Sequence, residues 1–244
     1  MTGYAAVVLA GGAARRMGGV DKPARPVGGR PMLHRVLAAV ADADQRIVVG
    51  PSGPLPDEVR TTREEPPGGG PVAATAAGLA LLDPATTTVA LLAADLPLLT
   101  AAAVTELRRA LDAPATDQPH APPAGQPHDP AAEREHDPAA EREHDLAAER
   151  KSALTPAGST VALACYVDAD GRRQQLCAVW RLPALRAALD RLAATRGGTL
   201  DGAPVRGLLT GVAVREVSWS GSGPPPWFDC DTDEDVRRAE EWSR

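Results

Sequence analysis

The chain has 244 residues, a formal net charge of −6 and a sequence pI near 5.4. This acidic balance provides no broad attraction for nucleic acid or for an anionic membrane surface, and no apolar run approaches the roughly 18 residues that a membrane span needs. The positive charges near the start follow the apolar opening instead of preceding it, the reverse of a secretory signal, so we expect a cytoplasmic protein that binds neither nucleic acid nor membrane.

The first part of the chain alternates predicted strands and helices. Short apolar runs that end at glycine or at an acidic turn are typical of buried parallel strands, and apolar residues at helical spacing indicate the helices between them. The expected elements are, in order, a strand over 5–10, a helix over 32–40, a strand over 47–49, a helix that follows the 66–71 loop and runs to about 82, a strand over 89–93, and a helix that begins after Thr100. The inner face of the last helix would be Val104, Leu107 and Leu111.

Composition changes abruptly between about 112 and 156, where Pro, Ala, His and charged residues dominate. An eight-residue unit, HDPAAERE, occurs at 128–135 and 136–143 and returns as HDLAAERK at 144–151. The His-Asp pairs could indicate metal binding, but so few branched apolar residues are more typical of a disordered, tandemly duplicated insert. We therefore predict a single domain over 1–244, interrupted by a disordered insert at about 112–156.

Regular structure is expected to resume after the insert. The predicted elements are a strand over 160–167, a strand over 175–180, a helix over 182–194, a strand over 212–219, and a final helix that begins at Thr232 with the Ser/Thr-x-x-acid signature completed by Asp235. All three cysteines fall in this half without a close pairing motif and are expected to be buried thiols. Early strand–helix alternation and later grouped strands imply an α/β fold, with a mostly parallel sheet, a mixed edge and helices on both faces.

The segment LAGGAARRMGGVDK, from Leu9 to Lys22, carries the strongest functional signal. Gly11 and Gly12 end the first strand in a loop whose backbone N–H groups can approach a phosphate chain. Arg16 and Lys22 would bind a triphosphate and offset charge on departing pyrophosphate, which makes them candidate catalytic residues. The segment lacks both the Walker signature and the G-x-G-x-x-G spacing of a dinucleotide site. The alternative interpretation is a glycine-rich surface turn.

Acidic residues follow the third and the last strands. Asp95, in LLAADLP, is placed at the carboxyl end of a buried strand, where open α/β sheets bind ligands, and its carboxylate could hold Mg²⁺ and act in catalysis. Asp231, in the DCDT segment, could be a second metal ligand. Each has a structural alternative, because Asp95 could cap the next helix, and Asp231 or Thr232 could cap the last one.

These motifs, together with the GGGP loop at 68–71 and the closing DTDED segment, resemble the molybdenum cofactor guanylyltransferase family and its wider group of MobA-like NTP transferases. The resemblance runs from residue 4 to about 110 and resumes near 160. It implies a Rossmann-like NTP transferase fold in which GMP passes from GTP to molybdopterin with release of pyrophosphate, with Mg²⁺ as cofactor. Molybdoenzyme-maturation proteins are the partners that it implies beyond these small molecules.

The resemblance also implies the nucleotide-binding residues. These are Leu9, Ala10, Gly11, Gly12, Lys22, Glu65 and Asp95. Two positions depart from the family pattern, because Gly50 stands where an asparagine follows the second strand and Glu65 stands where an aspartate precedes the glycine-rich loop. Three alternatives remain at this level: a transferase that uses CTP, one that uses another phosphorylated acceptor, and a non-catalytic nucleotide-binding protein.

Overall fold

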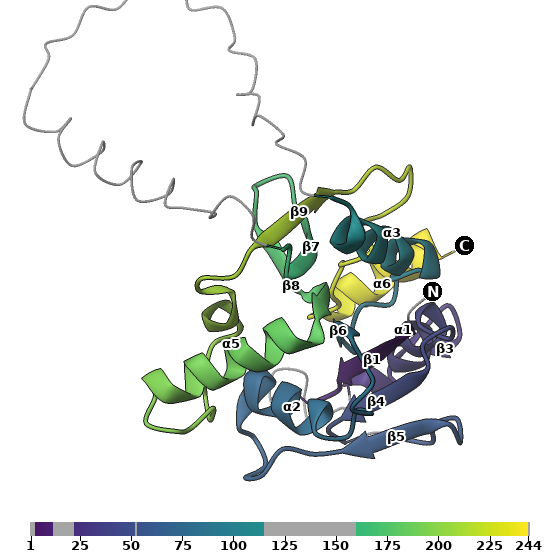
Figure 1. Ribbon diagram of the computed structural model, residues 1–244. Helices are drawn as coiled ribbons and strands as arrows, with labels where there is room; N and C mark the ends of the chain where they lie inside the picture. Colours follow the sequence, from purple (N-terminus) through teal and green to yellow (C-terminus); the bar gives the residue numbers. More distant parts are fainter. Residues whose placement is uncertain (1–2, 12–21, 52, 115–159, 244) are drawn as a thin grey trace, which may run out of the picture. The chain divides into compact units, whose positions relative to one another are not determined.

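The computed structural model describes residues 3–11, 22–51, 53–114 and 160–243 (Figure 1). The described residues up to 113 and from 161 onward form one compact unit. Almost all of the predicted insert, including its three repeats, lies outside the described residues, so its disorder stays a prediction. Among the described residues, no helix has the length and apolar character needed to cross a membrane.

The elements follow the predicted order closely. In the first half they are β1 (Tyr4–Leu9), the 3-10 turn η2 (Lys22–Ala24), β2 (Pro26–Val27), β3 (Arg30–Pro31), α1 (Met32–Ala39), β4 (Gln45–Val49), β5 (Val59–Thr62), α2 (Gly70–Leu79), β6 (Thr88–Ala93) and α3 (Ala101–Asp112). In the second half they are β7 (Leu163–Val167), β8 (Arg173–Arg181), α5 (Leu182–Thr195), the 3-10 helix η4 (Val205–Leu209), β9 (Val214–Ser218) and α6 (Asp233–Trp242).

Seven strands form one sheet in the order β5-β4-β1-β6-β8-β7-β9. Neighbouring strands pair in parallel except on the two sides of β8, which runs against both β6 and β7. All six residues of β1 are buried, as expected of a strand covered on both faces. The predicted mostly parallel sheet is confirmed, and its antiparallel strand lies two strands in from the β9 edge.

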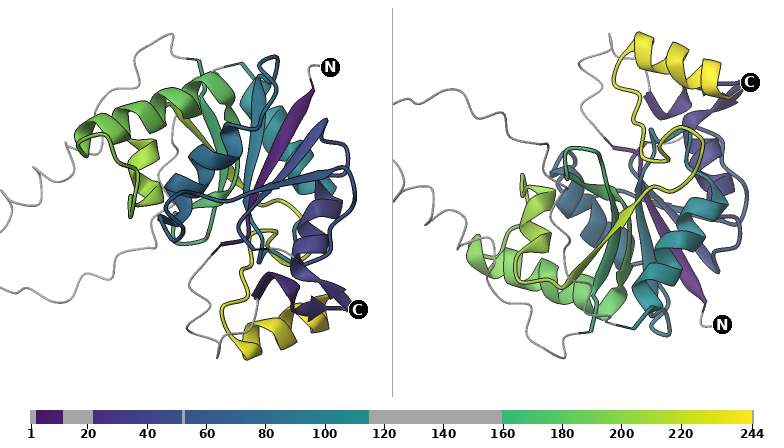
Figure 2. Two further views of the ribbon diagram at one scale, coloured as in Figure 1. Left: turned by 90° about the horizontal axis from the view of Figure 1, so that it is seen from below. Right: turned by 90° about the horizontal axis from the view of Figure 1, so that it is seen from above.

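Helices cover both faces of the sheet because side chains alternate along each strand. Ala6 and Val8 of β1 belong to a core shared with α1 and α3, whereas Val7 and Leu9 belong to one shared with α2 and α5. In Figure 2, α2 and α5 lie together on one side of the sheet. The predicted inner face of α3 is buried, and Thr100 caps that helix by accepting a hydrogen bond from the Ala103 N–H.

A third, smaller core joins the C-terminal helix to the β2–β3 hairpin. Its buried members are Val27, Met32, Leu98, Cys230, Val236 and Ala239. The helix begins with the predicted capping box, in which Thr232 and Asp235 satisfy each other's backbone N–H groups. Figure 2 shows α6 beside the hairpin that follows Lys22. This contact brings the end of the chain to the segment after the glycine-rich motif.

Three strands were not predicted, namely the two-residue strands β2 and β3 and, in the seven-stranded sheet, β5. Strand β5 has four residues, VRTT, of which only Val59 is buried, and it pairs with β4 at the edge of the sheet. Such a short and polar stretch carries no apolar periodicity, so its pairing depends on the neighbouring strand. Strand β5 matters for the site because it delivers the chain to the loop before α2.

Candidate nucleotide site

Two of the candidate residues and a third from the far end of the chain meet at the carboxyl ends of the parallel strands. The Lys22 Nζ donates hydrogen bonds to Asp95 Oδ2 at 2.5 Å and to Asp231 Oδ1 at 2.7 Å. The Lys22 and Asp95 side chains are 21% and 23% exposed, whereas that of Asp231 is 70% exposed. The stronger electrostatic contact is therefore the partly buried Lys22–Asp95 pair, because solvent screens the Asp231 contact.

Backbone hydrogen bonds fix the segments that carry these side chains. The Ala94 N–H donates to the Leu9 carbonyl at 3.0 Å, so the chain stays in sheet register up to Asp95. The Cys230 N–H donates to the Asp95 carbonyl at 3.2 Å, which attaches the segment of Asp231 to the same strand end. Asp95 does not cap the following helix, since Thr100 does, so that alternative is wrong.

Lys22 is held in its charged form. Burial by itself lowers the pKa of Lys22, but hydrogen bonds and charge from Asp231 and Asp95 outweigh this effect, and the net pKa is raised above its ordinary value. A fixed ammonium group at the carboxyl ends of the strands is suited to bind the oxygens of a phosphate chain. The site therefore presents one permanent cation beside two carboxylates.

The predicted backbone-binding residues lie beside this cluster. Leu9 ends β1, and Ala10 continues its pairing by donating its N–H to the Val49 carbonyl at 2.8 Å. Gly11 packs against Gly50, whose φ is +116°. A Cβ added to Gly50 would lie 2.6 Å from the Gly11 nitrogen, so this position has no space for a side chain. The asparagine of the family pattern is thus replaced by a residue that allows two backbone segments to touch.

Two predicted residues cannot be placed. Gly12 and Arg16 lie outside the described residues, so the phosphate-binding role of the one and the catalytic role of the other stay predictions.

The loop after β5 carries two adjacent glutamates, Glu64 and the predicted Glu65, which the sequence could not tell apart and the structure distinguishes. Glu65 is exposed, whereas the adjacent Glu64 is 8% exposed. Glu64 Oε1 accepts a hydrogen bond from the Gly68 N–H at 3.0 Å, and its Oε2 is buried without a hydrogen-bond partner among the described residues. A buried carboxylate oxygen is costly to leave unpaired, which makes Glu64 a candidate to accept a hydrogen bond from a ligand. Only the alternation of burial through the loop distinguishes it from Glu65.

The two carboxylates at the site are too few to hold a metal ion through protein side chains alone, but they are enough for Mg²⁺. The described residues contain no group of three or more His, Cys, Asp or Glu side chains arranged to hold a metal ion. Mg²⁺ is commonly bound through one or two carboxylates, with waters and substrate phosphates completing its shell. Asp95 and Asp231 supply that number of carboxylates next to one cation.

Comparison with known proteins decides the family. A model described as the MobA-like NTP transferase domain matches residues 6–200. The chain belongs to this family. The match covers β1 from its third residue, all of β6 and the loop that bears Glu64, so the glycine-rich segment and Asp95 both lie within it. The resemblance drawn from the motifs is thereby confirmed.

Several MobA-like NTP transferases and other proteins of the same fold are similar to this chain. The molybdenum cofactor guanylyltransferase of Bradyrhizobium sp. (strain ORS 278) is 35% identical over 130 residues, which cover 48% of this chain and 58% of that protein. The solved structure of molybdopterin-guanine dinucleotide biosynthesis protein A from Archaeoglobus fulgidus has a TM-score of 0.59 at 17% identity and 97% coverage of both chains. That of 2-C-methyl-D-erythritol 4-phosphate cytidylyltransferase from Thermus thermophilus has a TM-score of 0.56 at 18% identity and 97% coverage of both.

These likenesses differ in what they establish. The chain spans less than two thirds of the length of the curated relatives that it matches. The two solved structures are each below 20% identical and therefore show the nucleotidyltransferase-type fold alone. Because one is described as a guanine dinucleotide biosynthesis protein and the other as a cytidylyltransferase, the fold does not choose between GTP and CTP.

Proposed function

We propose that this protein transfers GMP from GTP to the phosphate of a molybdopterin acceptor and releases pyrophosphate. The observation that carries the proposal is the meeting of Lys22 and Asp95, 2.5 Å apart, at the strand ends where the backbone of Leu9 to Gly11 also lies. Family membership supports the reaction class, and the curated relatives support the guanylyl group and the acceptor.

In the proposed reaction, an oxygen of the acceptor phosphate attacks the α-phosphorus of GTP, and the bond from that phosphorus to the oxygen bridging the β-phosphate breaks. Lys22 would bind the phosphate chain and offset the charge that develops on pyrophosphate. Asp95 and Asp231 would hold Mg²⁺, which when bound neutralises charge on phosphate oxygens. The acceptor phosphate is already anionic, so catalysis requires positioning and electrostatics without a protein nucleophile.

Glu64 supports guanine over cytosine. Its Oε1 is occupied by the Gly68 N–H, so Oε2 is left to accept a hydrogen bond. Guanine presents two adjacent donors, a ring N–H and an amino group, whereas the corresponding edge of cytosine presents one amino donor beside ring and carbonyl acceptors. A carboxylate can only accept, so it favours guanine.

The test of the reaction is pyrophosphate release from each of the four common NTPs plus Mg²⁺, with and without molybdopterin. We expect GTP with molybdopterin to give the highest kcat/KM. Asp95→Asn should lower kcat by about a hundredfold or more, because it removes a carboxylate proposed to hold Mg²⁺ and to fix the Lys22 ammonium group. The matched control is Asp112→Asn. Asp112 pairs with Arg181, which lies opposite Thr88 at the amino end of β6, away from the carboxyl ends of the strands. Loss of the Asp112 carboxylate should leave kcat within twofold.

The outcomes separate the alternatives. A preference for CTP or for another phosphorylated acceptor would identify a related transferase. NTP binding without pyrophosphate release would identify a non-catalytic nucleotide-binding protein, and normal turnover by Asp95→Asn would refute the assigned site. Glu64→Gln, which introduces an amide donor, should reduce the preference for GTP over CTP by about tenfold. The control Glu58→Gln, at an exposed glutamate that pairs with Arg46, should leave the preference unchanged.

A further inference from the structure

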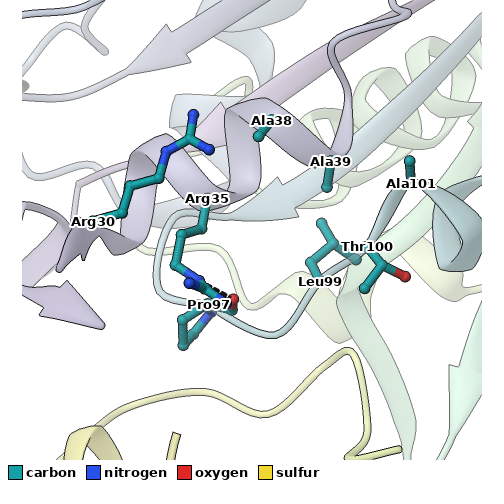
Figure 3. Close-up of a pocket in the computed structure, with 8 residues that line it drawn as sticks. All are labelled: Arg30, Arg35, Ala38, Ala39, Pro97, Leu99, Thr100 and Ala101. Carbon is teal, nitrogen blue, oxygen red and sulfur yellow. Dashed lines mark hydrogen bonds between the residues drawn. The ribbon is translucent and has the colours of Figure 1, made fainter. Parts of the chain in front are cut away.

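Arg35, on α1, lies outside the residues proposed to bind substrate, yet its guanidinium connects three separate segments. Its Nε donates to the Pro97 carbonyl at 2.6 Å, its Nη1 donates to the Val27 carbonyl at 3.3 Å, and its Nη2 donates to Ser243 Oγ at 3.2 Å. Figure 3 shows the side chain reaching from α1 to Pro97. A planar guanidinium holds its N–H donors in fixed directions and can therefore bind three acceptors at once. A lysine ammonium group, a point charge on a flexible stem, would not fix these segments in the same way.

Each connected segment also carries one member of the charged cluster. Pro97 is two residues beyond Asp95, in the turn after β6. The β2 strand, which contains Val27, follows directly after the turn that begins at Lys22. The α6 helix, which is capped at its end by Ser243, starts two residues after Asp231. We propose that Arg35 is a positioning residue that sets the relative places of these three charged side chains.

The surroundings of Arg35 show that the three segments converge there. A Cβ added to Gly28, in the turn between β2 and β3, would lie 3.3 Å from Arg35 Nη1 and 3.6 Å from Ser243 Cβ. Arg25, just before this hairpin, forms an ion pair with Asp233 at the start of α6. The hairpin and the C-terminal helix are thus joined at both ends of their contact. Arg35 adds a link from these two elements to the Asp95 turn, beside the Cys230–Asp95 backbone hydrogen bond.

A cavity of about 310 Å³ adjoins the side chain, lined by Arg30, Arg35, Ala38, Ala39, Pro97, Leu99, Thr100 and Ala101 (Figure 3). Because this side of Arg35 is open, removing its guanidinium leaves no sealed void. We therefore expect an Arg35 variant to fold, and its main defect to be a loosened connection among the three segments.

The inference rests on the proposed function for the catalytic role of Lys22, Asp95 and Asp231. The arrangement of these three side chains can nevertheless be tested without measuring turnover. The chain contains two lysines, Lys22 and Lys151. Treatment of the full chain with a trace of acetic anhydride, followed by peptide mass spectrometry, therefore reports the reactivity of the Lys22 amine with Lys151 as internal reference. An amine held between two carboxylates reacts more slowly than one that has been released from them.

For Arg35→Ala we expect the Lys22/Lys151 acetylation ratio to rise at least threefold and kcat for pyrophosphate release to fall about tenfold. The matched control is Arg108→Ala. Arg108 is also partly buried, pairs with Asp42 at 3.0 Å and lies over the Tyr4 ring at 3.9 Å, at the amino end of β1. This control should lose comparable thermal stability yet keep both readouts within twofold.

An Arg35→Ala chain with an unchanged acetylation ratio, or with the same ratio as Arg108→Ala, would overturn the inference. If Arg35→Ala does not fold, Arg35→Gln, which keeps the stem and one amide group, is judged by the same criteria. If the unaltered chain releases no pyrophosphate from any NTP, the proposed function fails, and the acetylation ratio still decides the role of Arg35.

Discussion

Gly50→Ala tests whether the glycine-rich site depends on close contact between two backbone segments. Gly50 has φ of +116°, a conformation that costs a residue with a side chain about 1–3 kcal/mol. The new Cβ would also lie 2.6 Å from the Gly11 nitrogen and 3.0 Å from the Ala10 carbonyl carbon. These are backbone atoms that cannot rotate away, so relief requires the end of β1 to move, at about 1–3 kcal/mol more. The expected total is about 2–6 kcal/mol.

Urea unfolding gives the free energy of unfolding, and steady-state kinetics give KM for GTP. The control is Gly211→Ala, because Gly211 also has a positive φ, of +68°, but an added Cβ there meets no described atom within 4 Å. It should lose only the conformational part, about 1 kcal/mol, and keep its KM. Gly50→Ala should lose more and raise KM severalfold because Gly11 is displaced. Equal losses in the two variants, with KM unchanged in both, would refute the reasoning.

Two further predictions concern thiols and helix capping. Burial raises the pKa of Cys165 to about 11 and of Cys177 to about 12. Thiol reagents should therefore modify these residues at pH 8 only after denaturation, and rapid native labelling would contradict their burial. Because the folded state keeps these thiols neutral, their contribution to stability is full below about pH 8. Above that pH the unfolded thiols ionise, so the free energy of unfolding should fall by about 1 kcal/mol per thiol between pH 8 and 10. A flat profile in pH-dependent urea unfolding would argue against this. Thr232→Ala should cost about 1 kcal/mol in the same assay through loss of the α6 cap, and Thr232→Ser should restore most of it.

Local pattern in the sequence was sufficient for most elements and for part of the site. The apolar run of β1 and the alternation of strands and helices predicted a parallel sheet, since such strands must be buried on both faces. Thr100 and Thr232 marked two helix starts correctly, because capping depends on residues three positions apart. Asp95 was expected at the end of a strand and is found there, since its strand is apolar up to that point.

Contacts between segments distant in the sequence could not be predicted and became visible only in the tertiary structure. The sequence does not show that Asp231 reaches Lys22 across 209 positions, because that contact depends on how α6 packs against the hairpin. Nor could it choose Glu64 over Glu65, since the two are chemically alike and differ only in which one the loop buries. Arg35 had no motif at all, and its three acceptors belong to segments that meet only when the sheet and its covering helices are assembled. Periodicity and capping depend on residues close together in the sequence, so they can be predicted from it. The convergence of charged side chains at the carboxyl ends of the strands depends on the packing of the whole sheet and its helices.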